Sequence, residues 1–171
     1  MTYNIDGRIG VDVSASPTTT AAWPVGMRTR LNDGSEWAYL TIGTSQAISQ
    51  YMAVGGTTGS LTVPLTSTNA LTGVPIYIAQ QAVTSNASSV QYMWFLCANP
   101  LASSSYKVRV AASCAVAAKL ATTANGGTLD DTTAGTVLRV DGIVLTDSQP
   151  AGSSGSRTFR TSTYPMGWGA V

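Results

Sequence analysis

The chain has 171 residues and a mass of 17.6 kDa, which is enough for one domain with short extensions and too little for two full domains. Only 10% of the residues are charged, against about 25% in an average soluble protein, and Ser and Thr together make up about a quarter of the chain. The net charge of +1 indicates neither a strongly acidic nor a strongly basic partner, and the lack of histidine excludes histidine triads, histidine metal sites and imidazole pH switches.

Cysteine content and the N-terminal residues indicate the compartment. Cys97 and Cys114 are too few for a disulfide framework and lack the CxxC spacing of zinc or redox sites. Asp6 and Arg8 stand where a signal peptide needs an apolar stretch, so we expect no secretion signal. The longest apolar run, residues 92–98, is too short to cross a bilayer as a helix. We therefore expect synthesis in a cytoplasm, no membrane partner, and two reduced, buried thiols; a disulfide between them is the alternative.

β-Branched and aromatic residues between closely spaced turn signals predict an all-β protein, because helical periodicity is nearly absent. About nine or ten short strands suit a single compact β-barrel or a β-sandwich, and the sequence leaves these two open. In chain order, the expected strands are residues 36–43, 48–54, 61–65, 75–83, 90–98, 106–112, 119–123, 128–129, 137–146 and 157–163.

Four of these segments carry more specific expectations. Residues 90–98 are apolar on both faces, which predicts a central strand covered on both sides. In residues 106–112, the alternation places Tyr106, Val108 and Val110 inward and Lys107 and Arg109 outward. Asn125-Gly126 predicts a type I′ hairpin turn, and Asp141-Gly142 predicts a bulge or sharp bend inside a long strand. A short helix over residues 113–120 is the less favoured alternative to a loop.

Composition divides the chain into three parts. A polar, proline-containing stretch sets off residues 1–24, which we expect to form an N-terminal arm. Residues 25–148 carry most of the predicted strands and form the β-barrel or β-sandwich domain. Residues 149–171 begin with a linker-like Gly- and Ser-rich run and add the last strand and a C-terminal tail.

Motifs that carry catalysis are lacking. The glycine-rich stretches lack the Gly-Lys-Ser/Thr ending of a phosphate-binding loop, and no Gly-x-Ser-x-Gly sequence is present. The carboxylates Asp130, Asp131, Asp141 and Asp147 could hold a hard cation or form an acid–base pair, but turn formation explains them better. We expect no catalytic residue, no bound metal and no cofactor, and interpret the chain as a protein other than an enzyme.

The basic and aromatic residues point to protein contacts rather than to nucleic acid. The scattered lysines and arginines are not interleaved with aromatic residues on one face, so we expect no nucleic-acid partner. Trp94 is explained as a core residue. Trp23 and Trp168 instead lie in arm-like segments, where a large aromatic side chain usually needs a partner surface to cover it.

Residues 110–146, VAASCAVAAKLATTANGGTLDDTTAGTVLRVDGIVLT, resemble a pattern of small head-decoration proteins of tailed bacteriophages. Upstream, EWAYLTIGTSQAISQYMAVGG, VPIYIAQQAV and VQYMWFLCAN are similar to earlier strands of that family. The resemblance extends from about residue 36 to residue 146. It implies a structural virion protein, or cement protein, that binds the major capsid protein on the outer surface of a completed shell and stabilises it as a homo-oligomer, with a trimer favoured. The family contributes no catalytic residues.

On this interpretation, the expected contacts to the capsid or to neighbouring subunits come from apolar residues outside any evident core. These are Tyr3, Ile5, Trp23 and Pro24 in the arm, with Trp168 as an alternative. A second hypothesis is a glycan- or receptor-binding module of a phage head or tail fibre, which adds a host-surface glycan as a partner and requires an exposed, coplanar pair of aromatic rings. A tail-tube or connector subunit is a third.

Overall fold

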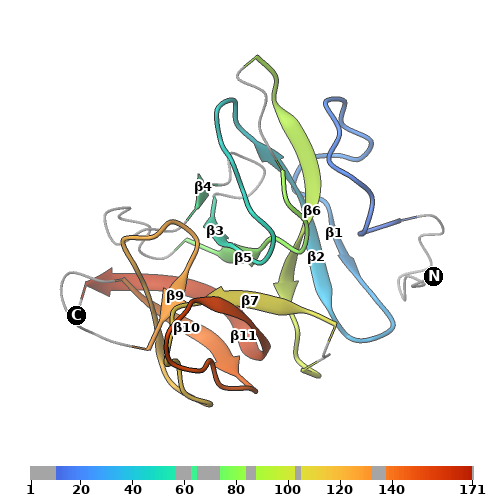
Figure 1. The fold of residues 1–171 in the computed structure, drawn as a ribbon. Coiled ribbons are helices and arrows are strands. Elements are labelled where there is room, and N and C mark those ends of the chain that lie inside the picture. The colour runs from blue at the N-terminus through green and yellow to red at the C-terminus, as the bar shows by residue number, and fades with distance from the viewer. Residues whose placement is uncertain are drawn as a thin grey trace.

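Eleven strands in the described part of the chain form a six-stranded sheet and a small, closed five-stranded barrel (Figure 1). The structure, a computed structural model, describes residues 11–56, 63–64, 74–83, 88–102, 105–131 and 138–170, without the side chains of 63, 138 and 162–170. The strands are β1 (Arg28–Arg30), β2 (Glu36–Ile42), β3 (Ala53–Gly55), β4 (Val63–Pro64), β5 (Ile76–Ile78), β6 (Gln91–Ala98), β7 (Lys107–Val110), β8 (Leu120–Thr122), β9 (Leu129–Asp130), β10 (Leu138–Leu145) and β11 (Gly155–Ala170). The predicted all-β class is confirmed, and the molecule contains both a barrel and an open sheet.

The sheet has the strand order β1-β2-β6-β5-β3-β4, so β6 lies in the interior with β2 and β5 beside it. Strands β2 and β6 pair along their whole length, from Glu36 opposite Ala98 to Ile42 opposite Gln91. Every residue of β6 from Met93 onward is buried. The continuous apolar run of this strand therefore has the cause predicted from the sequence: both of its faces are covered.

Alternating side chains of the sheet fill two separate cores. The core between the sheet and the barrel takes Trp37 and Trp94 from the sheet and Val108 and Phe159 from the barrel, which makes the two parts one folding unit. The core on the other face of the sheet contains the residues in between. It consists of Ala38, Leu40, Ile42, Ile48, Val54, Tyr77, Ala79, Val83, Met93, Phe95 and Cys97.

The barrel has the strand order β10-β11-β7-β9-β8, with one parallel pair, β7 and β9. In β7, Val108 and Val110 are fully buried, whereas Lys107 and Arg109, which alternate with them, are half-buried, as the alternation predicted. Between Asp141 and Ile143 the register of β10 against β11 shifts, and Gly142 adopts φ +90°. The predicted irregularity at Asp141-Gly142 is confirmed.

Backbone hydrogen bonds join the sheet to the barrel. The N–H of Arg109 donates to the carbonyl of Tyr51 at 2.7 Å, and the N–H of Ala53 donates to the carbonyl of Gly127 at 2.9 Å. Gly127 has φ +71°, and a Cβ placed on it would lie 2.6 Å from the Cβ of Met52. Glycine is required there both by the backbone conformation and by the close approach of the two parts.

Two local predictions were wrong in detail. Residues 48–54 are not one strand: Ile48 makes an isolated bridge to Val83, Tyr51 has φ +69°, and only Ala53–Gly55 forms β3. The hairpin between β8 and β9 exists, but its turn is not type I′, because the positive φ falls on Gly127 rather than on Asn125-Gly126. Residues 113–119 form turns, in agreement with the favoured interpretation, and the less favoured helix does not occur, since Ser113 and Ala117 both adopt positive φ.

One strand was not predicted, and other strands differ from the sequence prediction in extent. β1 was not predicted, because three residues between turns give no readable alternation. The predicted strand at 75–83 is ordered as a strand only over Ile76–Ile78, with isolated bridges at its ends. The last strand, β11, is much longer than the predicted 157–163. Of the predicted strand at 61–65, only Val63–Pro64 lies within the described residues.

Candidate interaction surface

Residues 11–27 cross the sheet near the strands β1, β2 and β6 (Figure 1). Val11 is buried in the core shared with the barrel. Thr18 forms an antiparallel bridge with Tyr92, with N–H to carbonyl distances of 3.1 and 2.8 Å. The N–H of Ala22 donates to the hydroxyl of Tyr39 at 3.1 Å. The described part of the expected arm is thus attached to the body by side-chain burial and by backbone hydrogen bonds.

A turn at Trp23 and Pro24 brings this segment into β1. The N–H of Met27 donates to the carbonyl of Pro24 at 3.0 Å, and the N–H of Gly26 donates to the carbonyl of Tyr39 at 2.7 Å. Trp23 and Met27 are half-buried and pack on the edge of the shared core, whereas Pro24 is exposed. This turn therefore exposes Pro24 and part of Trp23, and the packing of Trp23 and Met27 on the core holds it in place.

The five residues predicted for the interface are placed only in part. Trp23 and Pro24 lie side by side in this turn. Tyr3 and Ile5 lie outside the described residues, and Trp168 lies within β11 at a position where only the backbone is described. We refer to Trp23, Pro24 and the half-buried Met27 as the Trp23 turn.

Aromatic rings near this turn are stacked, but not in the form that a sugar platform needs. Tyr39 and Tyr92 are nearly parallel, with ring centroids 6.2 Å apart and an interplanar angle of 15°. Tyr39 is only 3% exposed and also contacts Trp94, so it belongs to the core. Within the described residues, this near-parallel pair offers one accessible ring at most. A sugar would need an exposed face from each ring.

A polar network fixes the β1–β2 turn against the start of β7. The hydroxyl of Tyr106 donates to Asp33 Oδ2 at 2.6 Å, and the hydroxyl of Ser35, which is fully buried, donates to Asp33 Oδ1 at 2.6 Å. The Trp37 indole N–H donates to Ser35 Oγ at 3.0 Å, and its ring meets Tyr106 edge to face. These contacts tie a turn of the sheet to the barrel through side chains that all have partners.

The electrostatics of this network favour a charged Asp33 and a neutral Tyr106. Burial raises the pKa of the Asp33 carboxyl, but the hydrogen bonds from Ser35 and Tyr106 outweigh it and hold the pKa below its usual value. Burial, with the hydrogen bond to Asp33, raises the pKa of Tyr106 to about 12. The carboxylate beside Ser35 is that of Asp33, and it is a poor proton acceptor because its pKa is lowered. The group is suited to structure rather than to catalysis.

The two thiols are buried in different cores and are not paired with each other. Burial raises the pKa of Cys97 to about 12 and that of Cys114 to about 11, so both are protonated at neutral pH and are weak nucleophiles. Ligand atoms of Cys114, Asp130 and Asp131 lie within 4.8 Å of one another and could surround a divalent cation. In this arrangement the thiol instead donates to Asp130 Oδ1 at 3.6 Å, and Asp131 accepts the Ala115 N–H at 2.8 Å.

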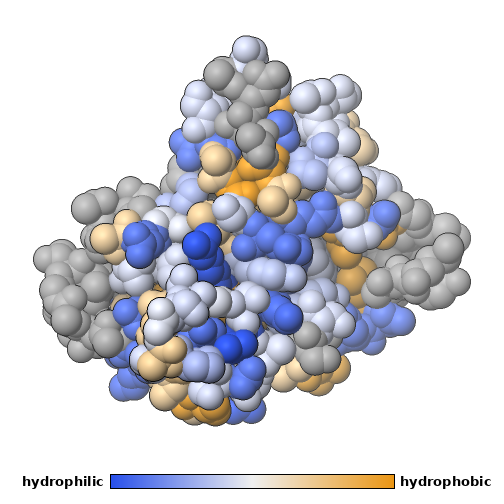
Figure 2. All heavy atoms as spheres, in the orientation of Figure 1, coloured by the Kyte–Doolittle hydropathy of each residue, from blue (hydrophilic) through white to orange (hydrophobic). Residues whose placement is uncertain are grey.

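The remaining predicted carboxylates and arginines form separate pairs. Asp141 contacts Arg139 at 2.8 Å, and Asp147 lies 3.9 Å from Arg157. The four aspartates singled out in the sequence are therefore not one cluster, and turn or ion-pair contacts account for three of them. On the face of the molecule seen in Figure 2, hydrophobic residues form separate small areas among hydrophilic ones.

Sequence reasoning missed two polar groups that the fold brings together. The Asp33–Ser35–Tyr106 contacts join residues far apart in the chain, and only the turn signal at Asn32-Asp33-Gly34 hinted at part of them. Gln149, expected to lie in a linker, is buried. No pattern in its neighbourhood distinguishes it from the exposed residues on either side.

Comparison with known proteins gives no match: no protein-family model, no curated protein and no solved structure is significantly similar to the chain. In the part of the chain that the structure describes, no helix is long and apolar enough to cross a membrane.

Proposed function

We propose that this protein is a structural virion protein that binds the outer surface of a tailed-phage capsid and stabilises the shell. The observation that carries the proposal is the resemblance of residues 36–146 to head-decoration proteins. Those residues supply β2 to β10, and side chains from both ends of the segment meet in one core. A body of this kind, with few charges and with its sheet and barrel joined by a shared core, suits a role that depends on rigidity and contact.

The mechanism is stabilisation by preferential binding. A protein that binds across the seam between capsid subunits in the closed lattice lowers the free energy of that lattice by its binding free energy. Each contact can be weak, since an oligomer engages several sites at once. The Trp23 turn is the proposed contact, because it holds an exposed proline and a half-buried tryptophan on a supported backbone. The major capsid protein is the proposed partner.

The test is a titration of purified protein onto undecorated heads of the phage that encodes it, with bound copies counted after sedimentation. We expect saturation at a fixed ratio to the major capsid protein and greater resistance of the heads to heat. Failure to bind, or binding of only a few copies, would refute the proposal. A glycan screen would then test the fibre or receptor-binding hypothesis.

Two matched variants locate the contact separately from the function. Pro24→Glu places a charge on the exposed part of the Trp23 turn, and Val116→Glu places the same charge on an exposed apolar residue in the turn between β7 and β8. We expect reduced occupancy for Pro24→Glu alone. If both variants saturate like the wild type, the protein is a decoration protein whose contact lies elsewhere. Deletion of residues 1–10 tests Tyr3 and Ile5 in the same assay.

A further inference from the structure

The connection between β10 and β11 contains one buried side chain, that of Gln149. Residues 146–148 and 150–154 are exposed, whereas Gln149 between them is only 7% exposed. The N–H of Gln149 donates to the carbonyl of Cys114 at 2.8 Å, and the N–H of Ser113 donates to the carbonyl of Pro150 at 3.2 Å. We call residues 146–154 the cap. It is bonded directly to the turn that carries Cys114.

The Gln149 amide is satisfied on one side only. Its Nε2 donates to the carbonyl of Ser153 at 2.8 Å, within the cap itself. Its Oε1 is buried and accepts no hydrogen bond. A Cβ placed on Gly155 would lie 2.6 Å from this oxygen, so the amide rests directly on the backbone at the start of β11. The anchor of the cap therefore holds an acceptor that water could satisfy only if the cap moved.

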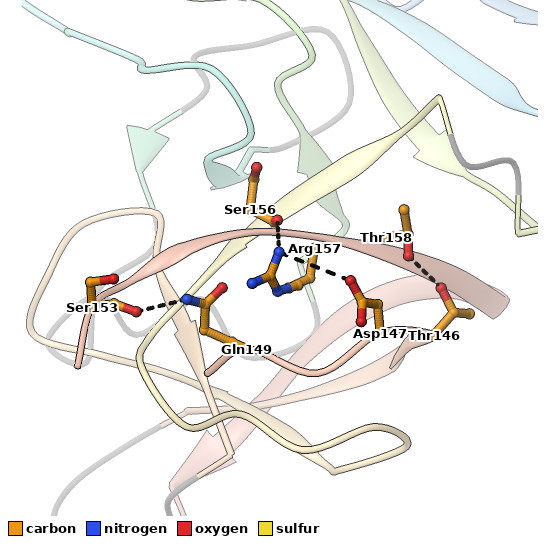
Figure 3. A network of polar contacts seen from close by, with 7 residues as sticks. All are labelled: Thr146, Asp147, Gln149, Ser153, Ser156, Arg157 and Thr158. Atoms are coloured by element: carbon orange, nitrogen blue, oxygen red, sulfur yellow. Dashed lines mark hydrogen bonds and ion pairs between the residues drawn. The ribbon is translucent and has the colours of Figure 1, made fainter. Parts of the chain in front are cut away.

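Arg157 presents the complementary unpaired atom. It lies opposite Val108 in the pairing of β11 with β7, and directly opposed residues share a face, so it extends on the inner face of the barrel. Its Nη1 donates to the carbonyl of Ser156 at 3.3 Å and lies 3.9 Å from Asp147, while Nε is buried without a partner. Figure 3 shows the Gln149 side chain pointing toward the Arg157 guanidinium.

A buried donor and a buried acceptor, both unpaired, favour any state in which water reaches them. We propose that the cap opens as a unit while the sheet and the rest of the barrel stay folded, and that opening gives reagents access to the buried Cys114 thiol. Opening releases the hydrogen bonds of Gln149 and Pro150 to residues 113–114, together with those of Thr146 to the carbonyl and hydroxyl of Thr158. The opening free energy is then smaller than that of global unfolding, as for other locally opening units.

The two thiols of the native chain allow a direct test. Cys97 lies in the interior strand β6 and belongs to the core on the far face of the sheet, so it reports global unfolding. Cys114 reports opening of the cap. N-Ethylmaleimide is added to the native protein, and labelling of each cysteine is followed by mass spectrometry of the two peptides. We expect Cys114 to be labelled at least about tenfold faster than Cys97. Equal rates would overturn the proposal.

A variant and its matched control test the cause. Gln149→Met keeps the length of the side chain and removes the unpaired oxygen, so we expect labelling of Cys114 to become about tenfold slower. Gln50→Met removes an exposed glutamine that also donates to a carbonyl, that of Gln80 at 3.0 Å, and we expect no change. An unchanged or faster rate in Gln149→Met would contradict the proposed cause.

Hydrogen exchange of the wild type gives a measurement that needs no variant. We expect the amides of Ser113 and Gln149 to exchange faster than the amide of Leu31, which closes the fully bonded β1–β2 turn. Equal protection of the three amides would also overturn the opening of the cap.

Discussion

Replacing Tyr106 by Phe removes one hydrogen bond to a charged group and leaves the ring in place. The lost bond joins the Tyr106 hydroxyl to Asp33 Oδ2 at 2.6 Å, in a half-buried position between the sheet and the barrel. Hydrogen bonds to charged groups contribute about 1.5–3 kcal/mol to stability. Because this bond is partly exposed, we expect a contribution of about 1.5 kcal/mol. For a chain of this size that corresponds to a fall of about 3–6 °C in Tm.

The pH dependence separates this bond from a simple packing effect. The folded-state pKa of Asp33 is lowered, so its contribution is fully present above the unfolded-state pKa of about 3.9 and is lost as pH falls through the folded-state value. The raised pKa of Tyr106, about 12, keeps the hydroxyl protonated throughout that range. We therefore expect Tyr106→Phe to cost about 1.5 kcal/mol at pH 7 and clearly less at pH 2.5.

Urea unfolding at the two pH values measures both quantities, with Tyr92→Phe as the matched control. The ring of Tyr92 stacks on Tyr39 and is kept in Tyr92→Phe, so this control should change stability by less than about 0.5 kcal/mol. If Tyr106→Phe costs the same at both pH values, or no more than the control, Asp33 does not hold the turn electrostatically.

Two further predictions concern the joint between sheet and barrel, and urea unfolding measures both. Gly127→Ala should cost about 3 kcal/mol, because φ is +71° and the new Cβ meets the Cβ of Met52 at 2.6 Å; Gly34→Ala, at φ +79° beside an exposed and adjustable leucine, should cost only about 1 kcal/mol. Similar losses for the two glycines would contradict the close approach. Asn99→Ala should cost about 2–3 kcal/mol, since the fully buried Nδ2 donates to a barrel carbonyl at 2.7 Å, whereas Asn125→Ala in an exposed turn should change little. A small effect at Asn99 would show that this bond is replaced by water.

The sequence predicted those parts of the fold that local patterning determines. The alternation in β7 and the continuous apolar run of β6 each reflect which faces are buried, and burial acts on every residue of a strand. The irregularity at Gly142 was also readable, because glycine inside a long strand usually marks a place where pairing shifts. These predictions needed no knowledge of which strands are neighbours.

Predictions failed where contacts between distant segments decide the backbone. Residues 48–54 have strand-like composition, but Tyr51 takes a positive φ and its carbonyl accepts the N–H of Arg109, a bond that only the docked barrel supplies. The turn after β8 likewise places its positive φ at Gly127, where the backbone approaches Met52, instead of at Asn125-Gly126. Of the candidate interface, Trp23 and Pro24 could be singled out as apolar residues outside a strand. The packing of Trp23 on the shared core and the hydrogen bonds of Ala22 and Gly26 to Tyr39 required the fold.

The joint between the sheet and the barrel differs from the cap in how its polar groups are paired. This difference predicts two levels of stability in one small domain. At the joint, the side chains of Asn99 and Tyr106 have partners on the opposite part, and one apolar core continues across it. Changes there should lower global stability and speed the labelling of both thiols. At the cap, Gln149 and Arg157 hold unpaired buried atoms, and the bonds that would be lost on opening are few. Changes there should alter only Cys114, so Asn99→Ala and Gln149→Met should affect the ratio of Cys114 to Cys97 labelling differently. A single common ratio in all variants would mean that the domain opens only as a whole.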